Sequence, residues 1–450
     1  MVRDIEINNT ILLLDNYASD SHKLHTSLKK AGKENIVVVI DSDGFLPDDV
    51  ISVYEYFLGD FKCDDIVPGR PRYFNQINVP DYWEISGNNN FGKISNLNKE
   101  RARIFYAEPK HQRFVKVVDW YDERGIVRSS DHYNKYGILY ARTIFNAKGK
   151  RVNKAYFSVS GKEIIVENYV TKNIILNDGN ITKIFKTKTD FVTYFLKKAG
   201  LYESRLFFNT LSTSFLVSQN LSAGDSEDVL FWQESIGDEI PGNMRFILEG
   251  KSARKTKIVV QKRQAYNRLL ELGVSENMIK KLGYIYQFEK DNYNKPKALI
   301  CTNSDRIAEC CNLVEKLPEM HFYIAALTEM SAKLMDMDKY SNVSLYPGVK
   351  MTILEELFKE CDFYLDINYE SEIVSAVQRA FLHNQLIFAF KETMHNSEYI
   401  SGEHIYEIKS VDNMISCLKE IISNKDLLKE HLSKQHDAAF SESVEAYSQI

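Results

Sequence analysis

The sequence predicts an α/β protein with two Rossmann-like lobes and an antiparallel β-meander inserted into the first lobe. Two regions alternate between strand-like and helix-like spacing, and the region between them shows strand spacing only. A chain of 450 residues is long enough for two or three domains with their own cores. We expect the first lobe at residues 1–62 and 185–275, the insert at 63–184, the second lobe at 276–424 and a C-terminal helix at 425–450.

The N-terminal region has a β-α-β pattern. Thr10–Leu14 is a short apolar run, Asp20–Gly32 has helical spacing, and Asn35–Ile40 is rich in β-branched residues. A crossover of this kind joins parallel strands. We expect the same sheet to be completed by strands at Leu206–Asn209, Val229–Trp232 and Met244–Leu248.

The insert is predicted from a regular rhythm between Phe114 and Leu176. A glycine recurs every twelve residues, each after a short polar turn, as suits the positive-φ corner of a hairpin. These glycines are Gly125, Gly137, Gly149 and Gly161. An aromatic residue precedes each turn, and the four are Trp120, Tyr133, Phe145 and Phe157. The rings either fill one face of the sheet or contact another molecule, and we predict that this sheet docks a partner.

The C-terminal part alternates strands and helices in the manner of a doubly wound sheet. The expected strands are Ala298–Cys301, His321–Ala325, Val343–Leu345, Phe363–Ile367 and Leu386–Phe390. The expected helices begin near Asp305, Thr328, Thr352, Ile373 and Val411. The tail from Lys425 to Tyr447 also has helical spacing.

Composition predicts a soluble cytosolic protein. The net charge of −5 gives no reason to expect nucleic acid as a partner. No apolar run approaches the roughly 20 residues needed to span a bilayer. Asp4 and Glu6 interrupt the segment where a signal peptide would need an apolar core. Six cysteines without CxxC spacing predict buried thiols in a reducing compartment, and they are Cys63, Cys301, Cys310, Cys311, Cys361 and Cys417.

Two Rossmann-like lobes around a cleft form the GT-B-type architecture of many nucleotide-sugar glycosyltransferases. A retaining enzyme of this shape has two carboxylates eight residues apart in its donor lobe. Glu370 occupies the first position, but Gln378 occupies the second, where a neutral amide holds ribose hydroxyls less firmly. The usual Phe-Gly pair between them is replaced by Glu372 and Ile373, and an acid beside a diphosphate repels it.

Two further parts of a donor site are missing. The turn after the first strand, Asp15–Asp20, has no glycine. The opening of the second lobe, Cys301–Arg306, lacks the Gly-Arg pair, and no lysine follows at the usual distance. We therefore expect no catalysis by this chain alone and no cofactor, with Arg306, Glu370, Glu372 and Gln378 as degenerate donor positions. The alternative is an active glycosyltransferase with an atypical donor site built on Glu370 and Arg306.

Other charged motifs favour structural roles. Asp41-Ser42-Asp43 resembles a metal-binding DxD, but a tight turn after a strand explains it better. No histidine pair has zinc-ligand spacing, so we expect no metal, and His111, His132 and His404 are interpreted as core or surface residues. The basic stretch 251–268 is interpreted as a solvated face rather than a contact with anionic lipid or an acidic partner.

Several segments together point to a known family. They are Asp43–Pro47, Arg72–Gln76, Val79–Glu84, Pro109–His111, Arg113–Trp120, Asp131–Lys135, Phe231–Glu234 and Pro241–Met244. In this combination, across essentially the whole chain, the sequence resembles the non-catalytic, chaperone-like stabilising subunit of the two-protein O-GlcNAc transferase of the bacterial accessory Sec system.

The resemblance implies a pseudoenzyme that works with a catalytic subunit. The catalytic subunit transfers GlcNAc from UDP-GlcNAc to Ser and Thr of a serine-rich-repeat adhesin before export. The present chain would bind the adhesin polypeptide and stabilise its partner, pairing through the inserted sheets in a hetero-oligomer, by resemblance a heterotetramer. The complex would lie at the cytoplasmic face of the membrane as a peripheral assembly. A scaffold that stabilises the partner without binding adhesin is the remaining alternative.

Overall fold

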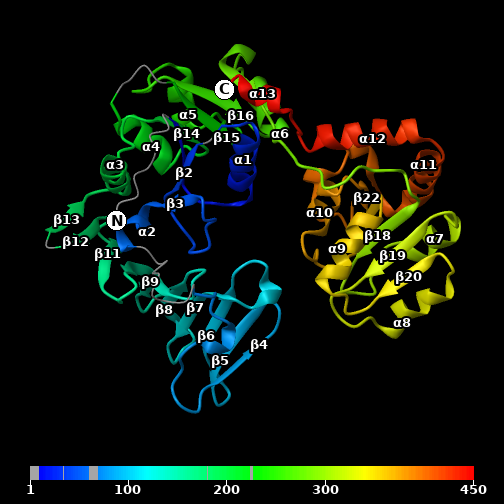
Figure 1. The fold of residues 1–450 in the computed structure, drawn as a ribbon, viewed down its shortest axis with the longest axis horizontal. Helices are drawn as coiled ribbons and strands as arrows, with labels where there is room; N and C mark the ends of the chain where they lie inside the picture. Colours follow the sequence, from blue (N-terminus) through cyan, green and yellow to red (C-terminus); the bar gives the residue numbers. More distant parts are fainter. Residues whose placement is uncertain (1–9, 34, 60–68, 180, 223–226) are drawn as a thin grey trace. The chain divides into compact units, whose positions relative to one another are not determined.

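The structure is a computed structural model that describes residues 10–33, 35–59, 69–179, 181–222 and 227–450 (Figure 1). The chain divides into two compact units, Met1–Leu282 and Gly283–Ile450. The expected start of the insert at residue 63, and Cys63 itself, lie outside the described residues.

The first unit contains a parallel seven-stranded sheet with the order β17-β16-β15-β14-β1-β2-β3. This is the strand order of a Rossmann-type sheet, interrupted after the third strand by the insert. Its strands are β1 (Thr10–Leu14), β2 (Ile36–Val39), β3 (Val50–Ser52), β14 (Arg205–Phe208), β15 (Asp228–Trp232), β16 (Thr256–Val260) and β17 (Ile279–Lys281). Its helices are α1 (Ser19–Lys30), α2 (Val53–Leu58), α3 (Lys188–Lys198), α4 (Thr213–Asn220), α5 (Gly242–Leu248) and α6 (Arg263–Glu271).

One expected strand of this unit is wrong. Met244–Leu248 lies in helix α5, where Met244 and Ile247, three residues apart, are the buried side chains. That spacing places both on one face of a helix. Pro241 stands directly before the first residue of α5, at a terminus where its missing N–H is no loss.

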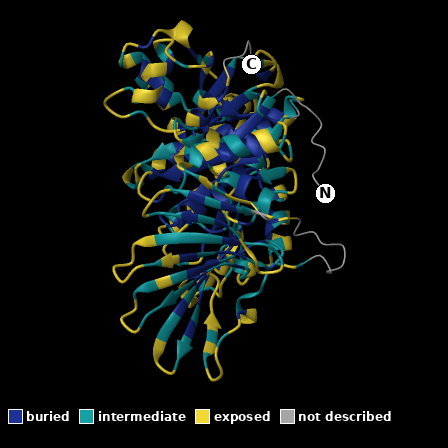
Figure 2. Cartoon of the chain, turned by 90° about the vertical axis from the view of Figure 1, so that its left-hand side faces the viewer, coloured by how far each residue is buried: buried dark blue, intermediate teal, exposed yellow. Residues whose placement is uncertain are grey.

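The insert is a ten-stranded antiparallel meander in which each strand pairs with its neighbours in sequence, from β4 to β13. Its strands are β4 (Glu84–Gly87), β5 (Phe91–Asn96), β6 (Lys99–Tyr106), β7 (Val115–Tyr121), β8 (Val127–Tyr133), β9 (Leu139–Phe145), β10 (Arg151–Phe157), β11 (Glu163–Asn168), β12 (Ile174–Asp178) and β13 (Ile181–Phe185). The four periodic glycines have φ between 71° and 78°, as the hairpin interpretation required. Figure 2 shows the exposed residues of this sheet concentrated at its turns.

One face of the insert packs on the parallel-sheet part of the first unit. The ring of Tyr156 on β10 stacks on Tyr54 of α2 with centroids 4.5 Å apart. Lys188 of α3 lies 2.9 Å from Asp41 and 3.1 Å from Glu167 of β11, so it joins the insert to the loop after β2. These opposite charges hold the pKa of Lys188 above its usual range despite its burial. The meander is therefore anchored through one face, and part of its opposite face is exposed to solvent.

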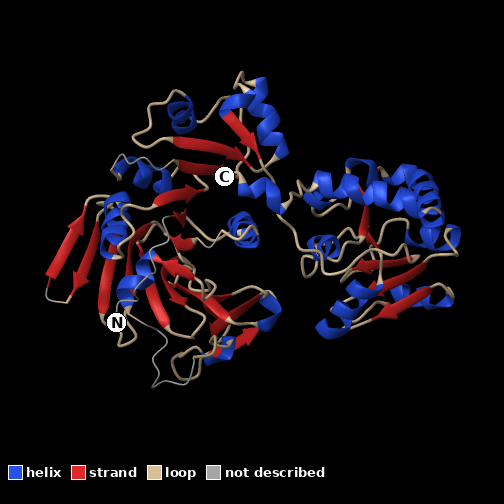
Figure 3. Cartoon of the chain, turned by 45° about the horizontal axis from the view of Figure 1, so that its top comes forward, coloured by secondary structure: helices blue, strands red, loops and turns tan. Residues whose placement is uncertain are grey.

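The second unit contains a parallel six-stranded sheet with the order β20-β19-β18-β21-β22-β23. Figure 3 shows helices on both sides of it, and each face carries its own apolar cluster. Its strands are β18 (Lys297–Cys301), β19 (His321–Ala325), β20 (Val343–Tyr346), β21 (Phe363–Asp366), β22 (Leu386–Phe390) and β23 (Ile405–Tyr406). Its helices are α7 (Cys310–Lys316), α8 (Ala332–Met335), α9 (Met351–Glu360), α10 (Ala376–Leu382), α11 (Val411–Ser423), α12 (Lys425–Ala438) and α13 (Val444–Ser448).

The predicted fold class, two Rossmann-like sheets with an inserted meander, is confirmed. Helix α10 begins later than expected near Ile373, because Val374 and Ser375 have positive φ values of 49° and 52°. Among the described residues, no helix combines the length and the apolar character needed to cross a membrane.

Candidate functional site

The carboxyl ends of β18 and β21 mark the place where a Rossmann-type sheet binds its ligand, because the strand order reverses between them. The loops after these two strands are bonded to each other. Ile307 and Asn368 form an antiparallel bridge, the Ala308 N–H donates to the carbonyl of Ile367 at 2.8 Å, and the Tyr369 N–H donates to Arg306 at 3.0 Å. A nucleotide at this position would have to displace contacts that the chain makes with itself.

The four degenerate donor positions lie around this junction. Arg306 and Glu370 form an ion pair at 2.9 Å with side chains 64% and 50% exposed. Glu372 accepts the N–H of Val377 at 2.9 Å and so holds the start of α10. Burial raises the pKa of Glu372. Gln378 is half-buried on α10. The structure thus brings the four positions to one edge, but uses two of the acids in contacts within the chain.

His395 closes the same edge from the loop after β22. Its Nδ1 lies 2.5 Å from the buried carboxylate of Asp366, and its Nε2 lies 2.5 Å from the carbonyl of Glu370. The bond to Asp366 raises the pKa of His395 to about 9. The protonated ring therefore fixes the Glu370 loop to the end of β21. No sequence motif around His395 predicts this role.

A cavity of about 280 Å³ opens between the loops that follow β18 and β19. Its lining includes Asp305 and Glu329, and none of the eight lining residues is basic. Phosphate sites need cations or free N–H groups, whereas two carboxylates repel a diphosphate. This cavity therefore does not suit a diphosphate.

The first sheet has a polar carboxyl edge of a different kind. Asn209, Gln233 and Gln261 directly follow β14, β15 and β16, and all three side chains are buried. The amide of Asn209 donates to Gln233 at 2.7 Å, and Gln233 donates to Gln261 at 2.8 Å. The side-chain oxygen of Asn209 is buried without a hydrogen-bond partner. This amide row, Asn209-Gln233-Gln261, suits neutral polar groups such as peptide amides.

Asp15, in the glycine-free turn, accepts hydrogen bonds from the backbone N–H groups of Thr213 and Ser214 at 3.1 and 2.9 Å. It therefore occupies the N-terminus of α4 with a carboxylate of the chain itself. An anionic substrate would meet this charge where other proteins of this architecture offer a free helix terminus.

The Asp41-Ser42-Asp43 motif is a turn, as expected. Asp43 accepts the N–H of Phe45 at 3.0 Å and lies 2.6 Å from Lys116, while Asp41 pairs with Lys188. Its carboxylates are thus engaged in a turn and in ion pairs.

The basic stretch 251–268 meets acids from elsewhere in the chain. Arg254 is buried against Asp228 at 2.9 Å, and Lys255 and Lys257 both bond Glu227. These pairs support the interpretation as a structural and solvated segment.

The four aromatic residues of the insert do not form one exposed row. Tyr133 is buried and carries Arg72 over its ring at 5.1 Å, and Trp120 donates from Nε1 to Asp131 at 3.0 Å. Phe145 and Phe157 are half-buried. Their roles in docking stay a prediction, but two of them are engaged within the sheet.

A different row is available on the face of the insert opposite to the one that packs on α2. Ala155 pairs with Val166, Val166 with Ile175, and Ile175 with Ile184. Directly paired residues share a face, so the four side chains form an apolar stripe across β10 to β13. Ile184 is 65% exposed and the other three are half-buried. We call this set, Ala155-Val166-Ile175-Ile184, the apolar stripe.

Sequence reasoning missed both the stripe and the amide row. Strand register decides which residues of β10 to β13 stand side by side, and no spacing within one strand reveals it. The amide row did carry a signal, since each member directly follows an apolar run that ends a parallel strand.

Comparisons with known proteins agree along the chain. Family profiles described as the N-terminal, middle and third domains of GtfB match residues 11–57, 83–186 and 188–272, and the GtfB/GlyA-F C-terminal domain matches 298–435. The chain is 41% identical over 442 residues to the UDP-N-acetylglucosamine–peptide N-acetylglucosaminyltransferase stabilizing protein GtfB of Streptococcus gordonii, covering 98% of this chain and 97% of the relative.

A more distant relative of the same description, from Limosilactobacillus reuteri, is 35% identical over 443 residues, covering 97% of this chain and 98% of that relative. Among solved structures, a chain of the GtfA/B complex bound to UDP and GlcNAc matches with a TM-score of 0.91 and 40% identity, over 98% of both chains.

Proposed function

The chain belongs to the family of GtfB proteins that stabilise peptide N-acetylglucosaminyltransferases, and from this premise we propose that it pairs with a GtfA-type catalytic subunit through the apolar stripe of its inserted sheet. In that complex it acts as the regulatory, non-catalytic subunit. The partner supplies the chemistry of transfer from UDP-GlcNAc to Ser and Thr.

The observation that carries this proposal is the contrast between the two faces of the insert. One face is packed on α2 through Tyr54 and Tyr156, whereas the opposite face ends in the half-exposed stripe. Full burial of an isoleucine side chain stabilises an association by about 1.5–3 kcal/mol. A continuous apolar row of this kind, unlike scattered single apolar side chains, is typical of an interaction surface. Edge strand β13 also offers backbone groups to a partner sheet.

Co-purification with the catalytic subunit tests the pairing. Ile184→Asp places a charge in the stripe and is expected to weaken pairing by at least about 30-fold, which is about 2 kcal/mol, because the carboxylate must be desolvated. Ile181→Asp is the matched control. Ile181 stands on the same edge strand with 61% exposure, but on the opposite face. Equal loss in both variants would refute the stripe as the docking surface.

The chain is further proposed to bind the acceptor polypeptide, a serine-rich-repeat adhesin modified in the cytoplasm before accessory Sec export. The amide row supports this part, because its bonds hold Asn209 with a side-chain oxygen that has no hydrogen-bond partner at the ligand-binding edge of the first sheet. An extended polypeptide offers backbone amides that such groups bond. The contacts are individually weak, which suits a repetitive substrate that advances as it is modified.

Affinity for an unmodified Ser-rich peptide tests the acceptor proposal. Asn209→Ala is expected to lower the peptide affinity of the complex about tenfold. The loss combines one hydrogen bond, about 1 kcal/mol, with the cost of leaving the bonded peptide group without a partner. Asn342→Ala is the control, since that amide bonds three carbonyls of the second unit. A chain that adds no peptide affinity to the catalytic subunit alone would leave only the scaffold function.

We also propose that the complex contacts the cytoplasmic face of the membrane peripherally. The basic residues of the stretch 251–268 are not expected to make that contact. Arg254, Lys255 and Lys257 are already paired with acids of the first unit. Binding of the complex to anionic vesicles is therefore expected to be unchanged by Lys255→Gln.

A further inference from the structure

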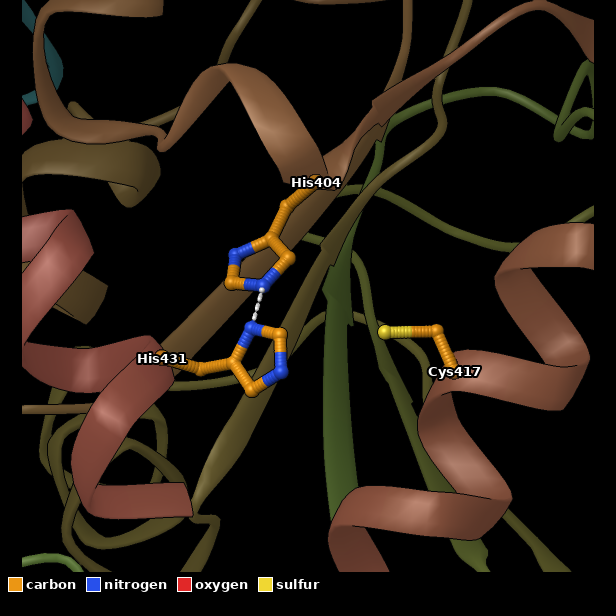
Figure 4. Close-up of side chains that lie close together, drawn as sticks. All are labelled: His404, Cys417 and His431. Atoms are coloured by element: carbon orange, nitrogen blue, oxygen red, sulfur yellow. Dashed lines mark hydrogen bonds between the residues drawn. The ribbon is translucent and has the colours of Figure 1, made fainter. Parts of the chain in front are cut away.

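Three side chains with metal-binding atoms meet in the second unit, far apart in sequence. His404 ends the short helical turn Gly402–His404, Cys417 lies in α11, and His431 lies in α12. Their candidate ligand atoms all lie within 4.8 Å of one another. Figure 4 shows the Cys417 thiol directed toward the two rings, with Nε2 of His404 2.8 Å from Nδ1 of His431.

We propose that His404, Cys417 and His431 form a binding site for Zn²⁺, with a water molecule as the fourth ligand. This inference is independent of pairing with a catalytic subunit and of acceptor binding. The site would connect α11, α12 and the segment that leads into β23.

The donor set is the first argument. Two imidazoles and one thiolate are ligands that zinc prefers, and their softness disfavours Ca²⁺ and Mg²⁺. Tetrahedral zinc with bonds of about 2.0–2.3 Å sets its ligand atoms about 3.3–3.7 Å apart. The two inner ring nitrogens lie 2.8 Å apart, and all three ligand atoms lie within 4.8 Å of one another. Side-chain rotations that move these atoms by about 1 Å therefore bring them to the separations that zinc needs.

Burial is the second argument. His404 is fully buried, and its ring lies 4.4 Å from the ring of Phe388 on β22, centroid to centroid. A buried imidazole is favoured in its neutral form, which is the form that binds a metal. Cys417 and His431 are half-buried, so solvent and an ion reach the site from their side. The buried ring is thus fixed, and the two more exposed ligands can adjust.

Proton balance is the third argument. In the ion-free pair of rings, one inner nitrogen carries the proton of the bond between His404 and His431. Zinc takes both inner lone pairs, so that ring moves its proton to its outer nitrogen. Cys417 releases its thiol proton to solvent. Zinc binding therefore releases one proton, that of the thiol, while the imidazole proton stays on its ring, and the net charge of the site rises by one.

The test uses the full chain after removal of any affinity tag, titrated with Zn²⁺ against a chromophoric chelator. We expect one zinc per chain. Substitution of Co²⁺ should give the near-ultraviolet charge-transfer absorption of a cobalt–thiolate bond. Cys417→Ser and His431→Gln should each weaken binding at least tenfold, since even outer-shell changes cost 10–100-fold. Both positions are half-buried, so these variants are expected to fold.

Cys311→Ser is the matched control, because Cys311 is an exposed free thiol on α7, outside the three-residue site. It should leave zinc affinity unchanged. Zinc should also raise the melting temperature of the wild type and of Cys311→Ser, but not of Cys417→Ser. The proposal is overturned if zinc binding is not stoichiometric, or if Cys417→Ser and His431→Gln bind as the wild type does.

Discussion

The inserted sheet and the carboxyl edge of the second sheet have opposite surfaces. The insert leaves the apolar stripe half-exposed, with Ile184 at 65% exposure. The edge around Glu370 instead bonds its polar groups to each other through Asn368 and His395. Free apolar surface gains from a partner, whereas polar groups that already have partners gain little. On the proposal made above, a partner is therefore expected at the face of the added sheet rather than at the carboxyl edge of the second sheet.

The largest effect is expected from a substitution in the contact between the insert and α2, because this contact holds the sheet that presents the stripe. Tyr54→Ala removes one of two stacked rings from a buried cluster, and we expect a loss of about 3–5 kcal/mol in the unfolding free energy of the first unit. All three tryptophans, Trp83, Trp120 and Trp232, belong to that unit. Urea unfolding followed by tryptophan fluorescence therefore reports on it specifically.

Tyr54→Phe keeps the ring and serves as the control, with an expected loss below about 1 kcal/mol. If Tyr54→Ala unfolds like the wild type, the insert is not anchored through this ring pair. The stripe would then not be presented by a rigid sheet.

The second test concerns the closed edge. His395 has a pKa raised from 6.5 to about 9 by its bond to Asp366. A raised pKa stabilises the folded state fully below pH 6.5, and this contribution is lost as the pH rises through about 9. We expect the advantage of the wild type over His395→Gln to shrink by roughly 1–2 kcal/mol between pH 6 and pH 9.5, after discounting for solvent at the ring.

Thermal unfolding followed by circular dichroism at both pH values measures this difference. His321→Gln is the control, because burial lowers the pKa of His321, which is the direction opposite to that of His395. A pH-independent difference for His395→Gln would show that the ring does not hold the Glu370 loop as a cation.

Much of the fold could be predicted because its signals are local. Strands such as β1, and hairpins such as the one at Gly125, follow from apolar runs and turn residues. The strand predicted at Met244–Leu248 was wrong because a segment of only five residues, four apolar and one basic, fits a strand as well as a helix. The buried pair Met244 and Ile247 becomes visible only once the helix packs. Strands β4 to β6 lack the twelve-residue rhythm, so no regular spacing of turns predicts them.

The candidate sites were less predictable because they depend on distant contacts. The unusual residues Glu372 and Gln378 are visible in the sequence, but the bonding of Arg306 to Glu370 is not. His404 and Cys417 are thirteen residues apart, and no local zinc spacing links them. Only the packing of the turn Gly402–His404 with α11 and α12 brings His404, Cys417 and His431 together.

The smallest expected effect separates the pseudoenzyme from an enzyme with an atypical donor site. Arg306 and Glu370 form an exposed ion pair, and such pairs contribute about 0–1 kcal/mol. Glu370→Ala should therefore change stability by less than about 0.5 kcal/mol and leave glycosylation by the complex unchanged. Gln378→Ala is the companion variant on α10. If the isolated chain binds a UDP-sugar saturably in calorimetry and Glu370→Ala abolishes that binding, the junction between β18 and β21 is a working donor site after all. The absence of a heat signal in both proteins would leave the ion pair as a surface contact between two loops.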